Sequence, residues 1–185
     1  PPDFFKYACQ NPVVLFFDEV DRAVTEVRQG LFELMDSRKL NGHKLHEDTL
    51  IFAAINGGDH GSEYHVSDMD PAELDRYSVW DLEPTVEDWL NWAKDNVNSV
   101  IWDFVNQNPH HLEHKEEFEP NKVYPSRRSW ERLDQCLVGA GLNADPQESA
   151  GTVMFNLASA FIGFEAAVAF NDFAAKYSKL VTVGD

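Results

Sequence analysis

A short apolar run that ends in two carboxylates constrains the fold of this chain more than any other feature. Residues 13–17 read VVLFF, and Asp18 and Glu19 follow them directly. A continuous apolar run of this length is typical of a strand covered on both faces, as in a parallel sheet between helices. Open α/β folds bind their ligands at the carboxyl ends of such strands. The sequence therefore predicts an α/β fold with two carboxylates at its ligand-binding edge.

Further α/β signals follow within the first 84 residues. Residues 21–37 are predicted to form an amphipathic helix, and residues 49–55 (TLIFAAI) a second buried strand. Residues 39–45 are expected to form a hairpin, because the Asn-Gly pair at its centre tolerates the positive φ angles of a tight turn. The apolar face of the helix has residues at spacings of three and four: Val24, Val27, Leu31 and Leu34.

A short helix and a third strand are expected before residue 84. A short helix is expected to begin at Pro71, because proline suits the first helical position. Asp70, directly before it, is of a residue type that caps helices. Residues 78–82 (SVWDL) are the third strand candidate.

Helical periodicity alone follows from residue 85 onward. The sequence thus predicts two domains, an α/β part over residues 1–84 and an all-α part over residues 85–185. Four tryptophans in the second part have the spacing of helix packing residues, and we expect them in its core. The expected helices of this part begin after Thr85, Ser126, Asp145 and Gly163.

Charge and composition exclude several classes of protein. The chain has 15 Lys and Arg against 32 Asp and Glu, a net charge of -17 that repels nucleic acid and argues against a broad nucleic-acid groove. Cys9 and Cys136 are far apart and without metal-ligand spacing, which suits a reducing compartment. We expect no membrane span and no signal peptide. The sequence predicts a soluble, cytoplasmic protein whose N-terminal part has been removed.

The Asp-Glu pair suits the hydrolysis of a nucleoside triphosphate. Asp18 is placed to hold Mg²⁺, directly or through water, and Glu19 to orient and deprotonate an attacking water. The alternative for a bare motif of this kind is a buried strand followed by a solvated helix start.

Four segments together resemble the MoxR-like group of AAA+ ATPases in order and spacing. They are the strand with Asp18 and Glu19, the strand that ends at Asn56, the LDRY segment with Arg76, and RRSW at residues 127–130. The resemblance implies that Asp18 and Glu19 are the Walker B acids and that Asn56 is sensor 1. It also implies that Arg76 is the arginine finger offered to a neighbouring subunit, whereas a surface ion pair with Asp75 or Glu73 is the alternative.

The same resemblance places sensor 2, a residue that senses nucleotide in the helical lid, in RRSW. Arg128 is favoured for this role because it directly precedes the Ser-Trp pair, and Arg127 remains the other choice. The hairpin at residues 39–45 matches the family's insertion before sensor 1, with an ordinary tight turn as the alternative.

One part of the family pattern is missing from these 185 residues. A phosphate-binding loop needs Gly-Lys followed by Ser or Thr, and the sequence contains no Gly-Lys pair. The resemblance therefore implies a partial AAA+ P-loop NTPase core, with strands 3, 4 and 5 of a 5-1-4-3-2 parallel sheet, followed by a C-terminal helical lid. We expect the chain alone neither to bind ATP tightly nor to complete the sheet.

The resemblance further implies that the ligands are ATP and Mg²⁺. It also implies assembly into a ring, expected to be a hexamer, and chaperone-like remodelling of client proteins. MoxR-like ATPases are often linked to partners with von Willebrand factor A domains. The alternative is a non-catalytic AAA+-derived module that docks on an active ATPase subunit. A metal-dependent hydrolase that uses His110, His111 and His114 is a third reading, for which a solvated linker is the simpler account.

Overall fold

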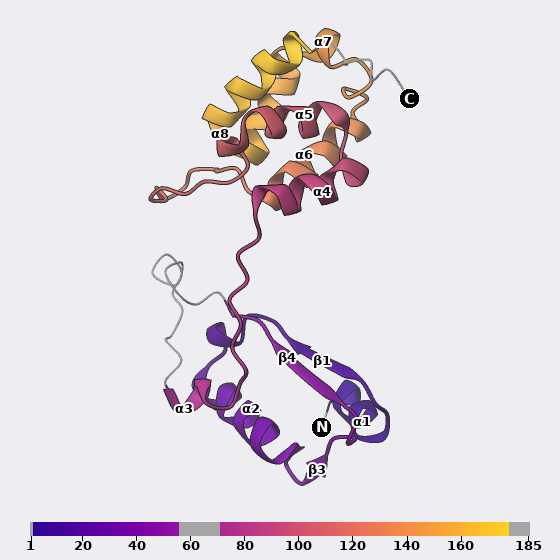
Figure 1. The fold of residues 1–185 in the computed structure, drawn as a ribbon, viewed down its shortest axis with the longest axis vertical. Coiled ribbons are helices and arrows are strands. Elements are labelled where there is room, and N and C mark those ends of the chain that lie inside the picture. The colour runs from indigo at the N-terminus through magenta and orange to yellow at the C-terminus, as the bar shows by residue number, and fades with distance from the viewer. Residues whose placement is uncertain (1, 56–70, 178–185) are drawn as a thin grey trace. The chain divides into compact units, whose positions relative to one another are not determined.

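The computed structural model describes residues 2–55 and 71–177 of the chain. The chain divides into two compact units, Pro1–Asp81 and Leu82–Asp185, which we call the N-terminal and C-terminal units. The division lies close to Pro84, where the sequence changes to purely helical periodicity. Figure 1 draws the elements of both units.

The N-terminal unit combines short strands and helices. A parallel pair of strands, β1 and β4, lies beside the helices α1 and α2, and a separate hairpin is formed by β2 and β3 (Figure 1). The elements in chain order are α1 (Asp3–Gln10), β1 (Val14–Phe17), the 3-10 turn η1 (Val20–Arg22), α2 (Thr25–Ser37), β2 (Lys39–Leu40), β3 (His43–Lys44), β4 (Leu50–Ala53) and α3 (Pro71–Leu74).

Strands β1 and β4 pair in parallel, with Val14 opposite Leu50 and Phe17 opposite Ala53. One face of the pair packs on the helices. Leu15 of β1 belongs to a small core cluster with residues of α1 and α2, and Phe17 and Ile51 pack against that cluster. The buried members of the cluster are Phe5, Ala8, Leu15, Leu34 and Leu45.

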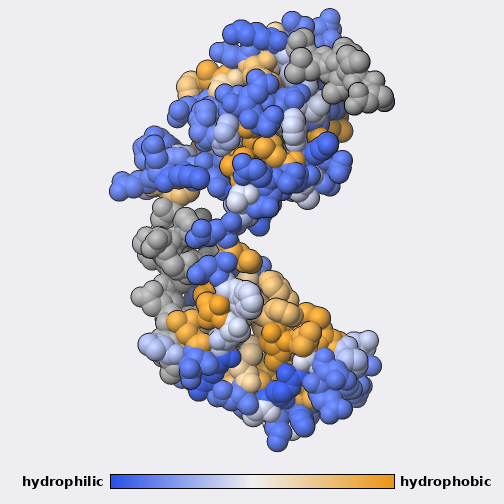
Figure 2. Space-filling model, in the orientation of Figure 1, coloured by the Kyte–Doolittle hydropathy of each residue, from blue (hydrophilic) through white to orange (hydrophobic). Residues whose placement is uncertain are grey.

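The opposite face of the same pair is bare. Val14 and Phe16 are each 62% exposed, and their partners Leu50 and Phe52 are 57% and 53% exposed. Hydrophobic residues accordingly gather on the surface of the N-terminal unit in the region of β1 and β4 (Figure 2). The run VVLFF was expected to be covered on both faces, whereas among the described residues only one face of the strand pair is covered.

Two local predictions for this unit are wrong. Residues 78–82 form no strand, and Trp80 and Leu82 are 81% and 90% exposed, because no neighbouring strand among the described residues pairs with them. The helix expected from residue 21 begins at Thr25, because Val24 has an extended backbone. Val24 and Val27, which were expected on the apolar face of this helix, are exposed. The hairpin is confirmed, with Asn41 and Gly42 at φ 49° and 81°.

The C-terminal unit is entirely helical among its described residues. Its elements are α4 (Val86–Asn96), α5 (Ser99–Gln107), the 3-10 turn η3 (Pro109–His111), α6 (Arg127–Gly139), α7 (Pro146–Ser149) and α8 (Thr152–Ala175). The helix starts expected after Thr85, Ser126 and Asp145 are confirmed, and each of these side chains accepts a hydrogen bond from the first turn of its helix.

Large side chains from four helices fill the core of this unit. Trp130, Phe104 and Phe170 are fully buried and lie with their ring centroids 5.4–5.7 Å apart. Trp89 is also buried, whereas Trp92 is 41% exposed, so the expected tryptophan core is present only in part. A cluster of this kind forms a closed hydrophobic core.

Gly163 interrupts α8, at the point where the sequence predicts a new helix. Its φ of 76° and ψ of 171° are not helical, and a Cβ at this position would collide with the carbonyl oxygen of Val123. Only glycine combines this backbone conformation with so close an approach by another segment. Gly163 therefore lets the connection between η3 and α6 pack directly on α8.

Helix α8 is also the one described helix that is long and apolar enough to cross a membrane, with a mean hydropathy of 1.7. No such segment was expected, because the sequence was interpreted as having no apolar run of membrane-spanning length. Met154 and Phe170, from the two halves of α8, are both fully buried in the core of the C-terminal unit. A core helix of this kind is compatible with a soluble protein.

Candidate functional site

The two candidate carboxylates lie at the carboxyl end of β1. The backbone there is fixed by β4, because the Ala54 amide donates to the Phe17 carbonyl at 2.9 Å and the Val20 amide donates to the Ala54 carbonyl at 3.2 Å. Asp18 and Glu19 stand between these two bonds and are both exposed. The strand pair thus presents two solvent-accessible carboxylates at one edge, as the sequence predicts.

Glu19 has an unusual backbone conformation. Its φ of 52° and ψ of 43° lie in the left-handed region, which an ordinary side chain occupies only at a cost of about 1–2 kcal/mol. Its carboxylate accepts an ion pair from Arg22 at 3.1 Å, with the Glu19 side chain 47% exposed. The turn therefore points the chain away from β1 immediately after Asp18, and Arg22 holds the second carboxylate in place.

A buried acid and a buried base beside this turn were missed by sequence reasoning. Asp21 in η1 is 2% exposed and Arg28 in α2 is 8% exposed, and both have interaction partners. Charged residues so deeply buried are rare unless they are paired. The sequence predicts a helix that begins at about Asp21, and no local pattern signals that this acid is buried.

Arg76 follows α3 and contacts α2. Its Nε donates to the Asp36 carboxylate at 2.9 Å, and its guanidinium lies 5.2 Å from the centroid of the Phe32 ring. The side chain is 30% exposed. A surface ion pair was the alternative for Arg76, and the observed partner is Asp36 rather than the adjacent Asp75. The guanidinium is thus anchored yet accessible.

Asn56, the candidate for sensor 1, lies outside the described residues, as does Asp70. Ile55 follows the end of β4, which lies beside β1 in parallel register and is held there by the hydrogen bond from the Ala54 amide to the Phe17 carbonyl. The chain therefore leaves β4 at the edge that carries Asp18.

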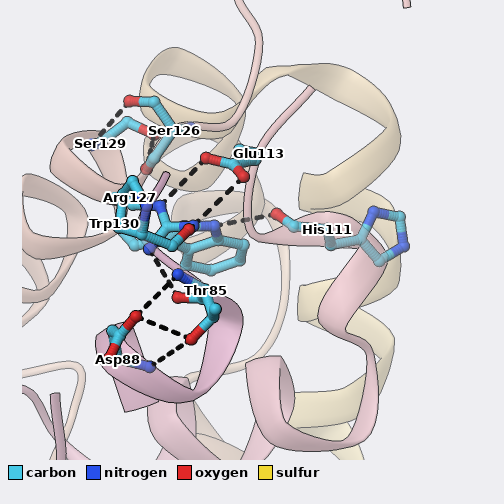
Figure 3. A network of polar contacts seen from close by, with 9 residues as sticks. Thr85, Asp88, His111, Glu113, Ser126, Arg127, Ser129 and Trp130 are labelled. Carbon is cyan, nitrogen blue, oxygen red and sulfur yellow. Dashed lines mark hydrogen bonds and ion pairs between the residues drawn. The ribbon is translucent and has the colours of Figure 1, made fainter. Parts of the chain in front are cut away.

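Arg127 has a structural role in the C-terminal unit (Figure 3). Its guanidinium makes a two-point contact with Glu113, at 3.0 and 3.3 Å, and donates to the carbonyls of Pro84 and Thr85 at 2.7 and 2.8 Å. The side chain is 21% exposed. These contacts occupy the fork of donors, so Arg127 ties the start of α6 to the start of α4.

The neighbouring Arg128 is exposed, and its side chain makes no hydrogen bond or ion pair with another described residue. Of the two arginines, it is the one whose donors are available to a ligand. The capping box of Ser126 and Ser129 fixes the first turn of α6, in which Arg128 lies.

The capping box of α4 adjoins the Arg127 contacts (Figure 3). The Asp88 carboxylate accepts hydrogen bonds from the Thr85 amide and hydroxyl, both at 2.8 Å, and these bonds lower the pKa of Asp88 from its ordinary value. Trp130 donates its indole N–H to the His111 carbonyl at 2.9 Å. Arg127 and Trp130 therefore connect α6 to the start of α4, to Glu113 and to the end of η3.

His111 is not a solvated linker residue. Its ring is half-buried and stacks on Phe104 with 5.7 Å between the ring centroids. Burial, followed by the neighbouring His110, lowers the pKa of His111. Across the described residues no group of three or more His, Cys, Asp or Glu is arranged to hold a metal ion.

Mg²⁺ bound together with a nucleotide does not need such a group. It keeps several waters and uses one or two carboxylates plus phosphate oxygens. Asp18, exposed at the end of a rigid strand pair, fits this donor set.

Comparisons with protein-family models, with curated proteins and with solved structures gave no match for this chain.

Proposed function

We propose that this chain supplies part of the catalytic site of a ring-forming ATPase of the MoxR-like AAA+ type. The observation that carries the proposal is the pair of exposed carboxylates, Asp18 and Glu19, at the carboxyl edge of the parallel strands β1 and β4. Parallel strands of α/β folds bind phosphate-bearing ligands at this edge.

Each candidate residue has a defined task in the proposal. Asp18 would hold Mg²⁺, directly or through water, and the cation would supply charge neutralisation for the phosphates of ATP. Glu19 accepts a proton from the attacking water, and Asn56 orients that water.

The proposed task of Arg76 is to donate its guanidinium to the γ-phosphate on a neighbouring subunit. Its anchorage supports this role, because Asp36 and Phe32 hold it at the surface of α2 while leaving it partly exposed. A phosphate presents the same kind of bidentate anionic acceptor as the Asp36 carboxylate. Arg128, with free donors on α6, is assigned to sense nucleotide.

A finger that acts in trans requires a neighbour, and the proposal therefore includes a ring, with six subunits expected. It also includes remodelling of a client protein, with a von Willebrand factor A-type partner as the family resemblance suggests, and a cytoplasmic location. The net charge of -17 favours protein clients over nucleic acid.

The decisive experiment measures ATP turnover by the gene product that includes any coding sequence before Pro1. Glu19→Gln should lower kcat by about 10²–10⁴-fold while Mg-ATP binding persists, because only the proton acceptor is lost. Glu26→Gln, an exposed acid on α2, is the matched control and should leave kcat unchanged. Unchanged turnover in Glu19→Gln would remove the proposed mechanism.

The 185-residue chain by itself gives a second test. Without a phosphate-binding loop it should show no micromolar binding of Mg-ATP in a calorimetric titration. Tight binding would contradict the assignment of this chain to one part of the nucleotide site.

A second candidate function is a non-catalytic module that docks on an active ATPase subunit. The bare apolar face of β1 and β4 and the lack of a Gly-Lys pair favour it. Mixing the chain with a complete ATPase of this type separates the two. Stimulated turnover that is lost with Arg76→Ala indicates a docking module that donates its finger.

A further inference from the structure

The first turn of α6 carries two adjacent arginines in opposite surroundings. The donors of Arg127 are occupied by other segments of the C-terminal unit (Figure 3), whereas Arg128 is exposed. Consecutive residues of a helix point about 100° apart, so neighbouring side chains leave the helix in different directions. Because both arginines belong to one turn, whatever fixes Arg127 also fixes the point from which the Arg128 side chain begins.

Arg127 restrains this turn from two sides. Its guanidinium donates to both carboxylate oxygens of Glu113, in the connection after η3, and to the carbonyls of Pro84 and Thr85 at the start of α4. A planar guanidinium that meets a carboxylate at two points has a defined orientation, which a lysine ammonium lacks. The start of α6 therefore cannot shift without breaking several contacts together.

Two further contacts restrain the same turn. The capping box joins the side chains and amides of Ser126 and Ser129 reciprocally. Trp130 is fully buried, and its indole N–H donates to the His111 carbonyl at 2.9 Å. The backbone on both sides of Arg128 is thus held in place, while the Arg128 side chain itself remains in solvent.

Stability alone is a weak account of the contact between Arg127 and Glu113. Their side chains are 21% and 34% exposed, and ion pairs between partly exposed groups contribute little to the free energy of unfolding. What such a pair adds is a fixed geometry at the start of α6.

We propose that Arg127 and Glu113 are positioning residues, which hold the first turn of α6 so that Arg128 meets the phosphates of ATP from a fixed place. The inference rests on the proposed function, in which Arg128 senses nucleotide. A donor that is held in place before binding loses less conformational entropy when it engages its ligand. Glu113 and Arg127 should therefore affect ATP affinity without contacting ATP.

The test measures the dissociation constant of Mg-ATP by calorimetry, in the gene product that includes any coding sequence before Pro1. Glu19→Gln is present throughout, so that ATP binds without turnover. Glu113→Gln keeps the shape of the side chain but removes the ion pair, and should raise Kd about three- to tenfold. Arg128→Ala should raise Kd about tenfold or more, because a charge-assisted hydrogen bond to phosphate is lost.

The combination of the two substitutions separates positioning from general support. Glu113→Gln should have no further effect in the Arg128→Ala background, because a positioning residue acts only through the arginine that it positions. A merely structural contribution would raise Kd by the same factor in both backgrounds. Glu119→Gln is the matched control and should leave Kd unchanged, since Glu119 pairs with Lys122 within the same connection rather than with α6.

Hydrogen exchange of the 185-residue chain tests the restraint without nucleotide. The amides of Ser129 and Trp130 donate to the Ser126 hydroxyl and carbonyl, both at 3.1 Å. Glu113→Gln should speed the exchange of these two amides at least about threefold, because the turn opens more often when its restraint is weakened. Glu119→Gln should leave it unchanged, and circular dichroism of each variant establishes that the fold is retained.

Three results would overturn the positioning role while leaving the proposed reaction intact. They are an unchanged Kd in Glu113→Gln, an equal rise in Kd with and without Arg128→Ala, and unchanged exchange at Ser129 and Trp130. Turnover that persists in Glu19→Gln would instead contradict the proposed function itself, and the inference would fall with it.

Discussion

In the C-terminal unit Phe104, Trp130 and Phe170 are fully buried, whereas in the N-terminal unit Phe16 and Phe52 are more than half exposed. The difference arises from how each unit surrounds its apolar residues. Helices α4, α5, α6 and α8 pack around a common core, while α1 and α2 cover only one face of the β1–β4 pair.

The two units therefore gain their stability from apolar burial in different ways. A closed core supplies stability from within, because burial of apolar area stabilises the fold without any partner. A sheet with one bare face gains the same stabilisation only when another segment covers it. Core variants of the C-terminal unit should therefore lower its stability strongly, whereas variants at the exposed residues Phe16 and Phe52 should lower stability little.

The largest expected effect is at Gly163. Gly163→Val places a branched side chain at φ 76° and against the Val123 carbonyl, and we expect the free energy of unfolding of the C-terminal unit to fall by about 3–5 kcal/mol. Denaturant unfolding followed by tryptophan fluorescence measures this in a Trp80→Phe background, because Trp80 is the one tryptophan within residues 1–81.

The control for this substitution is Gly139→Ala. A Cβ at Gly139 meets no atom within 4 Å, so its effect should stay within about 1 kcal/mol. If Gly163→Val unfolds like the control, the close approach of the 112–126 connection to α8 does not exist in solution.

An intermediate effect is expected from Arg127→Ala. The change removes four hydrogen bonds to Glu113, Pro84 and Thr85, and should lower the free energy of unfolding of the C-terminal unit by about 2–3 kcal/mol. The adjacent Arg128→Ala should change it by less than about 0.5 kcal/mol, because Arg128 is exposed. Equal effects of the two substitutions would contradict the distinct roles assigned to these arginines.

The smallest effect concerns pH. Burial makes the folded-state pKa of His111 lower than its ordinary value of 6.5, so protons bind more readily to the unfolded chain. The contribution of His111 to stability is therefore present above pH 6.5 and is lost as the pH falls through 6.5 toward the folded-state pKa.

Unfolding of the C-terminal unit at pH 7.5 and 5.5 measures this contribution. His111→Gln should reduce the difference between the two values, whereas His43→Gln, in the exposed hairpin of the N-terminal unit, should preserve it. A difference that stays the same after His111→Gln would place the pH dependence elsewhere.

Local signals account for what the sequence predicted well. The caps at Thr85 and Ser126 and the Asn41-Gly42 turn depend on residues within three positions of one another, and all are present. The same holds for Gly163, where the backbone conformation that only glycine accepts marks the end of a helical segment.

Distant contacts explain the failures. Residues 78–82 have the composition of a strand, yet a strand exists only where a neighbour pairs with it. The contact of Arg76 with Asp36 spans 40 positions, and no spacing rule identifies it. The ion pair between Arg127 and Glu113, 14 positions apart, was also not predicted, although the sequence favoured Arg128 over Arg127 for sensing nucleotide.

The left-handed backbone at Glu19 places the stability of the protein in conflict with its proposed catalytic function. Glycine adopts that conformation without strain and asparagine tolerates it better than glutamate does. A laboratory selection for heat resistance alone would therefore enrich Gly or Asn at position 19. Every such winner would have discarded the carboxylate that the proposed reaction needs, so thermostable variants of this protein should be screened for turnover before they are used.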